Sequence, residues 1–204
     1  MEEAMWAAAA GLLIGGGPVA RWAGRWTSID PWWWRWCAST CALWAGSVAA
    51  VLVRGGAEAR IAVPVAVLGA AGATLLSVLD LRERRLPHLV TAAVGAGAIT
   101  IGTIAGDGRA AVIGAAVAYG AHLLVRAVAP GALGGGDVQL TIAVGALAAP
   151  TGPVGWACAF VLAAATTALL GGRVRGASVP HGPSLCVAAM LIPMWSATVG
   201  SRTG

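Results

Sequence analysis

Long apolar runs, separated by short stretches that carry glycine, proline or arginine, dominate the pattern of this chain. A helix needs about 20 apolar residues to cross a bilayer, and most of the runs approach that length. The pattern therefore predicts up to eight apolar helices, six to eight of which cross the membrane. Their approximate ranges are 5–20, 32–53, 61–79, 89–105, 110–125, 138–149, 154–170 and 184–199.

Composition agrees with this pattern. Of the 204 residues 58% are hydrophobic and only 10% are charged, and the mean hydropathy is +0.81. The surface of a soluble domain does not sustain so apolar a composition. We therefore expect an all-α, polytopic integral membrane protein whose general partner is the lipid bilayer.

The basic residues indicate an orientation in the membrane. All 13 are arginines and the net charge is +5, yet they lie between apolar runs, so no nucleic-acid partner is predicted. If successive runs alternate sides, nine arginines fall on the side of Asp80 and four on the other, and Asp137 falls on the same side as Asp80. The positive-inside rule then places both aspartates on the cytoplasmic side of the inner (plasma) membrane.

Features near the N-terminus predict a retained first helix and an interfacial anchor. Glu2 and Glu3 open the first run, whereas a secretory signal begins with positive charge. Four tryptophans between residues 32 and 36 stand at the start of the second run, where their rings suit the headgroup level.

Small residues within the runs predict close helix packing. Gly11 and Gly15, or Gly102 and Gly106, follow a spacing that lets helices approach each other. The four cysteines form no CxxC pair, so buried packing is expected rather than a zinc site. They are Cys37, Cys41, Cys158 and Cys186.

Two aspartates stand in apolar surroundings: Asp80 ends a run, and Asp137 follows three glycines in GALGGGDVQL. A carboxylate near hydrocarbon is costly, by about 2.5–3.5 kcal/mol on insertion scales, so it is retained mainly for ion handling, proton relay or catalysis. Two such positions suggest one shared site. Capping of the following helix is an alternative explanation for Asp137 taken alone.

Paired carboxylates in a poorly solvated site titrate as a coupled unit that holds one proton. The ionised member takes a proton from water while the protonated member polarises a scissile carbonyl, as in aspartic proteases. This chemistry needs neither a cofactor nor a metal.

Three segments, in order, resemble the type IV prepilin (leader) peptidases, which are membrane aspartic proteases with a GxGD motif. The segments are DLRERRLPHLV from Asp80, ALGGGDVQLTIAVGAL around Asp137, and the late VPHGPSLCVAAML. The resemblance implies that Asp80 and Asp137 are the catalytic pair, and that Gly134, Gly136 and Pro87 are motif or positioning residues.

The same resemblance implies a six-helix peptidase core over 61–204, preceded by a two-helix membrane extension over 1–60. The substrate would be a prepilin or prepilin-like protein, of the Flp/Tad type for a short form such as this, cleaved after its short basic leader at the cytoplasmic face. Methylation is not expected, because the connection over 21–31 lacks the cysteine-rich insert of longer members.

The chain also departs from the family pattern. His88 stands where asparagine is frequent, Gln139 where lysine is common, and His181 where phenylalanine is usual. Two other functions therefore stay open: a non-catalytic assembly factor of a pilus or secretion system, and a small proton- or ion-coupled transporter. Metal binding by the two histidines with the aspartates is a further alternative. His122 is expected to be a hydrogen-bonded helix-packing residue.

Overall fold

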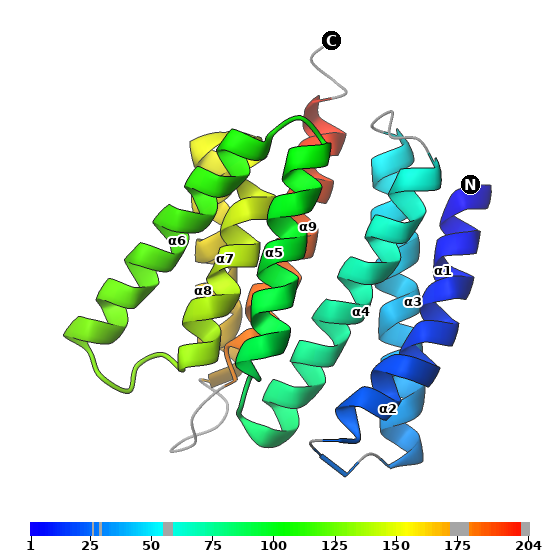
Figure 1. Cartoon of the computed structure of the whole chain (residues 1–204), viewed down its shortest axis with the longest axis horizontal. Helices are drawn as coiled ribbons and strands as arrows, with labels where there is room; N and C mark the ends of the chain where they lie inside the picture. The colour runs from blue at the N-terminus through cyan, green and yellow to red at the C-terminus, as the bar shows by residue number, and fades with distance from the viewer. Residues whose placement is uncertain (26, 29, 55–58, 172–179, 201–204) are drawn as a thin grey trace. The chain divides into compact units, whose positions relative to one another are not determined.

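Helices make up most of the computed structural model, which describes residues 1–25, 27–28, 30–54, 59–171 and 180–200 (Figure 1). Within those ranges there is no strand, and each of the eight predicted apolar runs coincides with a helix, which confirms the all-α fold. In chain order the elements are α1 (Glu2–Ile14), the π-helical turn η1 (Gly15–Val19), α2 (Ala20–Ala23), α3 (Pro31–Arg54), α4 (Ala59–Glu83), α5 (His88–Ile104), α6 (Gly108–Val128), α7 (Gly135–Ala148), the 3₁₀ turn η2 (Ala149–Thr151), α8 (Gly152–Gly171) and α9 (Gly182–Gly200).

The protein is a helical membrane protein. Among the described residues, three stretches are long and apolar enough to cross a bilayer: Val65–Glu83, Gly108–Val128 and Gly135–Leu169. His88–Ile104 and Gly182–Leu191 are shorter apolar helices. The count of six to eight crossings stays a prediction.

The chain forms two compact units, one of residues 1–83 with 194–204 and one of residues 84–193. This division follows the contacts between residues, whereas the predicted boundary at residue 60 follows the family resemblance and stays a prediction. Each unit is described by itself below.

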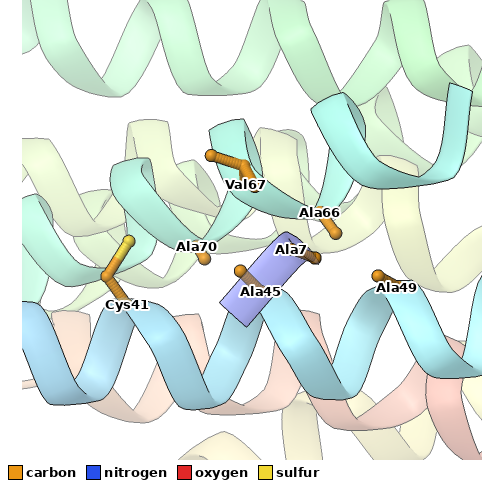
Figure 2. Close-up of a cluster of buried hydrophobic side chains, with 7 residues drawn as sticks. All are labelled: Ala7, Cys41, Ala45, Ala49, Ala66, Val67 and Ala70. Atoms are coloured by element: carbon orange, nitrogen blue, oxygen red, sulfur yellow. The ribbon is translucent and has the colours of Figure 1, made fainter. Parts of the chain in front are cut away.

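In the first unit, α3 packs against α1 and α4 through small side chains. A Cβ atom built on Gly11 would lie 2.7 Å from the Cys41 carbonyl oxygen and 2.9 Å from Ala45 Cβ, so only glycine permits this approach of α1 to α3. The predicted packing role of Gly11 is thereby confirmed. Figure 2 shows the buried cluster that results, which consists of Ala7, Cys41, Ala45, Ala49, Ala66, Val67 and Ala70.

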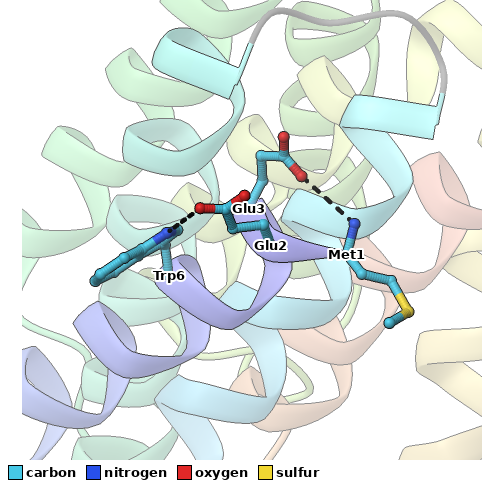
Figure 3. A network of polar contacts seen from close by, with 4 residues as sticks. All are labelled: Met1, Glu2, Glu3 and Trp6. Atoms are coloured by element: carbon cyan, nitrogen blue, oxygen red, sulfur yellow. Dashed lines mark hydrogen bonds and ion pairs between the residues drawn. The ribbon is translucent and has the colours of Figure 1, made fainter.

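Charged and polar groups at the start of α1 interact with one another. The N-terminal amine lies 3.5 Å from Glu3 Oε2, and Trp6 Nε1 donates a hydrogen bond to Glu2 Oε1 at 3.4 Å (Figure 3). Two acidic residues in the first turn of α1 also suit the positive end of the helix dipole.

One arginine near the end of α4 interacts with the segment before α3 and with the first turn of α3. Arg82 Nη2 donates hydrogen bonds to the Ser28 carbonyl oxygen at 2.8 Å and to Ser28 Oγ at 3.2 Å. Its guanidinium carbon lies 5.3 Å from the centroid of the Trp33 ring, within cation–π range. The predicted role of the tryptophans as an interfacial anchor stays a prediction.

In the second unit, α7 packs against α5 and α6. The α6–α7 contact is close because two glycines face each other: a Cβ built on Gly114 would lie 2.5 Å from the Gly145 carbonyl oxygen. In the α5–α6 hairpin, a Cβ on Gly102 would lie 2.6 Å from Ala111 Cβ. Gly106 was predicted to pack in the same way, which is wrong: it has φ +91° with nothing near its Cβ position, and it makes the turn.

Two further expectations have outcomes in this unit. His122 Nδ1 lies 2.8 Å from the Ala118 carbonyl oxygen, and its ring lies 5.1 Å from the Phe160 ring of α8, which confirms a helix-packing role. Cys158 is exposed on α8, so the expectation that every cysteine is buried is wrong for it, whereas the other three are buried. An apolar run shows that a helix meets hydrocarbon but not which of its faces does.

Candidate active site around Asp137

Asp80 lies near the C-terminal end of α4 in the first unit. It is only 5% exposed, and the preceding residues from Ala73 onward are all buried. Thr74, Ser77 and Asp80 are spaced three residues apart and so share one side of the helix. They form a buried polar stripe in an otherwise apolar stretch of the helix.

Asp137 lies in the second unit, in the first turn of α7. The N-cap of this helix is Gly134, with φ −66° and ψ 150°, so the alternative that Asp137 itself is the N-cap is wrong. Asp137 is instead the third residue of the helix, and its carboxylate lies beside Gly134. Its Oδ1 atom is buried and has no hydrogen-bond partner in the part of the chain that the structure describes. A buried polar atom left in this way is costly, so it indicates a missing partner.

Each of the three glycines before Asp137 is held against a neighbour. A Cβ on Gly134 would lie 2.9 Å from Asp137 Oδ2, and one on Gly135 would lie 2.5 Å from Arg126 Nη1. A Cβ on Gly136 would clash with the Leu86 side chain and lie 2.9 Å from its carbonyl oxygen. A side chain at any of these positions would therefore move the carboxylate, the arginine or the connection before α5.

Pro87 is the N-cap of α5. Its φ of −63° and ψ of 123° are those of an extended residue. Its carbonyl oxygen accepts hydrogen bonds from the backbone N–H groups of Val90 at 3.0 Å and Thr91 at 3.1 Å, which starts the helix. The predicted role of Pro87 as a positioning residue stays a prediction.

His88 and Gln139, two positions that depart from the family pattern, are in hydrogen-bond contact. His88 Nδ1 donates a hydrogen bond to Gln139 Oε1 at 3.0 Å, and the Thr91 hydroxyl donates to the same oxygen at 2.7 Å. This network joins the first turn of α5 to that of α7, next to Asp137. Thr91 was not among the predicted site residues, and its only sequence signal is a polar residue one turn into an apolar run.

A pocket of about 360 Å³ opens beside this network. His88, Arg126, Gln139 and Gly135 line its polar part, and apolar side chains that include Leu123 and Ile142 line the rest. Arg126 was counted in the sequence only as an orientation signal. The pocket makes it a candidate functional residue.

The third departure lies elsewhere in the second unit. His181 Nδ1 lies 2.6 Å from the Thr167 hydroxyl oxygen of α8. Within the described residues, no group of three or more His, Cys, Asp and Glu side chains has the arrangement to hold a metal ion. Because Asp80 and Asp137 belong to different units, their pairing stays a prediction.

Comparison with known proteins places the chain in a family. Searches of curated proteins and of solved structures found no match. The model of the type IV leader peptidase family matches residues 67–172, just over half of the chain. The match contains both aspartates, the glycine turn and the whole of α5, α6 and α7. The chain therefore belongs to the type IV leader peptidase family.

Proposed function

We propose that the protein is an aspartic leader peptidase in which Asp80 and Asp137 form the catalytic pair. The observation that carries the proposal is the buried Oδ1 atom of Asp137, which has no hydrogen-bond partner among the described residues although each of the three glycines before it lies against a neighbour. A second carboxyl group that shares a proton or a bridging water would satisfy this atom. Asp80, buried at the end of a polar stripe, is the candidate partner.

The length of the chain between the two sites is compatible with this pairing. Leu86 contacts Gly136, the neighbour of Asp137, and only five residues lie between Asp80 and Leu86 in the sequence. A fully extended chain over these six steps spans at most about 20 Å, so the proposed pairing needs no long connection.

The chemistry follows from one shared proton. The ionised carboxylate takes a proton from a water molecule, whose oxygen attacks the scissile carbonyl carbon, while the protonated carboxyl group donates its proton to the carbonyl oxygen. Collapse of the tetrahedral intermediate breaks the C–N bond, and the amine leaves with a proton from the pair. The reaction consumes one water molecule and requires no cofactor.

The substrate follows from the family: a prepilin or prepilin-like protein, here proposed to be of the Flp/Tad type, cleaved after its short basic leader. We place the catalytic pair at the cytoplasmic face of the inner membrane, because the nine arginines on that side obey the positive-inside rule.

The test is co-expression with a candidate prepilin, read as the mobility shift that follows loss of the leader. Asp80→Asn and Asp137→Asn should each abolish processing, because the amide neither ionises nor shares the proton. Asp107→Asn is the matched control, since Asp107 is an exposed residue before α6 and its side chain makes no capping hydrogen bond.

Unchanged cleavage in both active-site variants would disprove the aspartic mechanism. If all variants and the native protein fail to cleave any prepilin but restore pilus assembly in a deletion strain, the protein is a non-catalytic assembly factor. Proton uptake by purified protein in vesicles, lost in the same two variants, would instead support a transporter.

A further inference from the structure

The pocket beside the glycine turn is lined by two chemically different sets of side chains. His88, Arg126 and Gln139 provide hydrogen-bond donors, whereas Tyr119, Leu123 and Ile142 provide largely apolar surface. Its volume of about 360 Å³ falls in the range of small ligand sites. A ligand that fits it has a polar and an apolar part.

Arg126 gives the lining of the pocket a positive charge. Arg126 belongs to the last turn of α6, yet its guanidinium lies over Gly135, at the start of α7. The N-terminus of α7 carries a partial positive charge of about half a unit and unpaired N–H groups, which add to the charge of Arg126. The Asp137 carboxylate in the same first turn offsets part of this positive charge. Arg126 forms no ion pair with any carboxylate that the structure describes, Asp137 included. The Arg126 guanidinium and the N-terminus of α7 would both stabilise an anion in the pocket.

The apolar lining residues Tyr119 and Leu123 belong to α6, a helix with many exposed apolar side chains. α6 crosses the membrane by length and composition, and its outer side chains are exposed, with Val117 53%, Leu123 46% and Leu124 64% exposed. Arg126, three residues after Leu123, stands at the end of this span, where the headgroups of the bilayer lie. A long side chain such as Arg126 often extends toward the lipid headgroups, but this tendency does not explain why its guanidinium lies over Gly135 of α7.

We propose that this pocket binds the phosphate headgroup of an anionic phospholipid, with the adjoining acyl chain along the exposed face of α6. A free phosphate ion would use the polar side chains alone and leave the apolar lining of the pocket unexplained. The proposal concerns residues of the second unit only and does not depend on the pairing of Asp80 with Asp137.

The test is binding of phosphatidylglycerol and of phosphatidylcholine to the purified full-length protein, followed by native mass spectrometry from detergent. Phosphatidylglycerol should bind more tightly. Arg126→Gln should weaken that binding about five- to tenfold, because one arginine near anionic lipid contributes about 1 kcal/mol. Arg109→Gln is the matched control, since it removes the same charge from the opposite end of α6 and should leave binding unchanged.

A second variant changes no charge. Gly135→Ala places a Cβ against Arg126 Nη1 and should also weaken phosphatidylglycerol binding, with no effect on phosphatidylcholine. Equal losses in Arg126→Gln and Arg109→Gln would overturn the proposal, because they would show general attraction to charge. Complete competition by inorganic phosphate would assign the pocket to a free anion, and complete competition by a prepilin peptide would assign it to the substrate. Either result would overturn the lipid site.

Discussion

The α1–α3 contact and the surroundings of the glycine turn before α7 both depend on glycines that admit no side chain, but their neighbours differ. At α1–α3 the glycines face backbone and small apolar groups such as Ala45. At the turn they face Arg126, Leu86 and the carboxylate of Asp137 itself. Close approach in the first region produces only packing. In the second it holds charged and polar groups in one arrangement, which is what a reactive site requires.

The largest effect should come from Gly136→Val, which drives a branched side chain into Leu86. Displacement of the turn by even an ångström should reduce leader cleavage about 100-fold per folded molecule. Gly120→Val is the matched control, because a Cβ at Gly120 on α6 meets nothing within 4 Å. Equal cleavage by both variants would show that the turn does not hold the site.

Gly15→Val should act on stability rather than on cleavage. Its side chain would meet the Cys37 carbonyl oxygen and lie 2.7 Å from Cys41 Cβ, so overpacking should lower the free energy of unfolding by about 1–3 kcal/mol. Gly17→Val, at a position with open space, is the control. Thermal unfolding in detergent measures both. A stable Gly15→Val protein that has lost cleavage would contradict the division between the two regions.

The His88–Gln139 hydrogen bond should show itself in a double-mutant cycle. His88→Asn and Gln139→Lys should each lower the cleavage rate about fivefold, which corresponds to about 1 kcal/mol for one lost hydrogen bond. The double variant, which restores the residues frequent in the family, should cleave faster than the product of the single effects predicts. The pair His88→Asn with Asp107→Asn is the control and should be additive. Additivity in both cycles would mean that the network is not coupled to catalysis.

The smallest effect is expected for Arg82→Gln in the first unit. It removes the hydrogen bonds to Ser28 and the contact with Trp33, and the partly exposed site limits the loss in unfolding free energy to at most about 1 kcal/mol. Arg109→Gln serves as the charge control in the same thermal assay. A loss of several kcal/mol would mean that this contact, rather than small-residue packing, organises the first unit.

The helices could be predicted from the sequence because hydropathy reports contact with hydrocarbon, and each apolar run became a helix. The glycine turn before Asp137 was also visible, since Gly134, Gly136 and Asp137 match the GxGD motif in the family resemblance. The exposure of Cys158 was not predictable, because a run that is apolar on all sides does not indicate which face packs against protein.

Contacts between residues that are far apart in the sequence could not be predicted from it either. His88 and Gln139 are 51 residues apart and each was recognised only as a separate departure from the family pattern. Arg126 appeared in the sequence as one more loop arginine, and only its place over Gly135 makes it part of a pocket. Such pairings depend on how helices pack, which no local pattern encodes.

The central claim is that Asp80 and Asp137 converge, and cross-linking measures this directly. In a chain whose four native cysteines are replaced by alanine, Asp80→Cys with Asp137→Cys should be joined by a short bifunctional thiol reagent in native membranes. His88→Cys with Gln139→Cys is the positive control, because the native side chains are in hydrogen-bond contact, and Asp80→Cys with Asp107→Cys is the negative control. Cross-linking of the aspartate pair as efficient as that of the positive control is the result we predict, and a yield no higher than that of the negative control would contradict the catalytic pair.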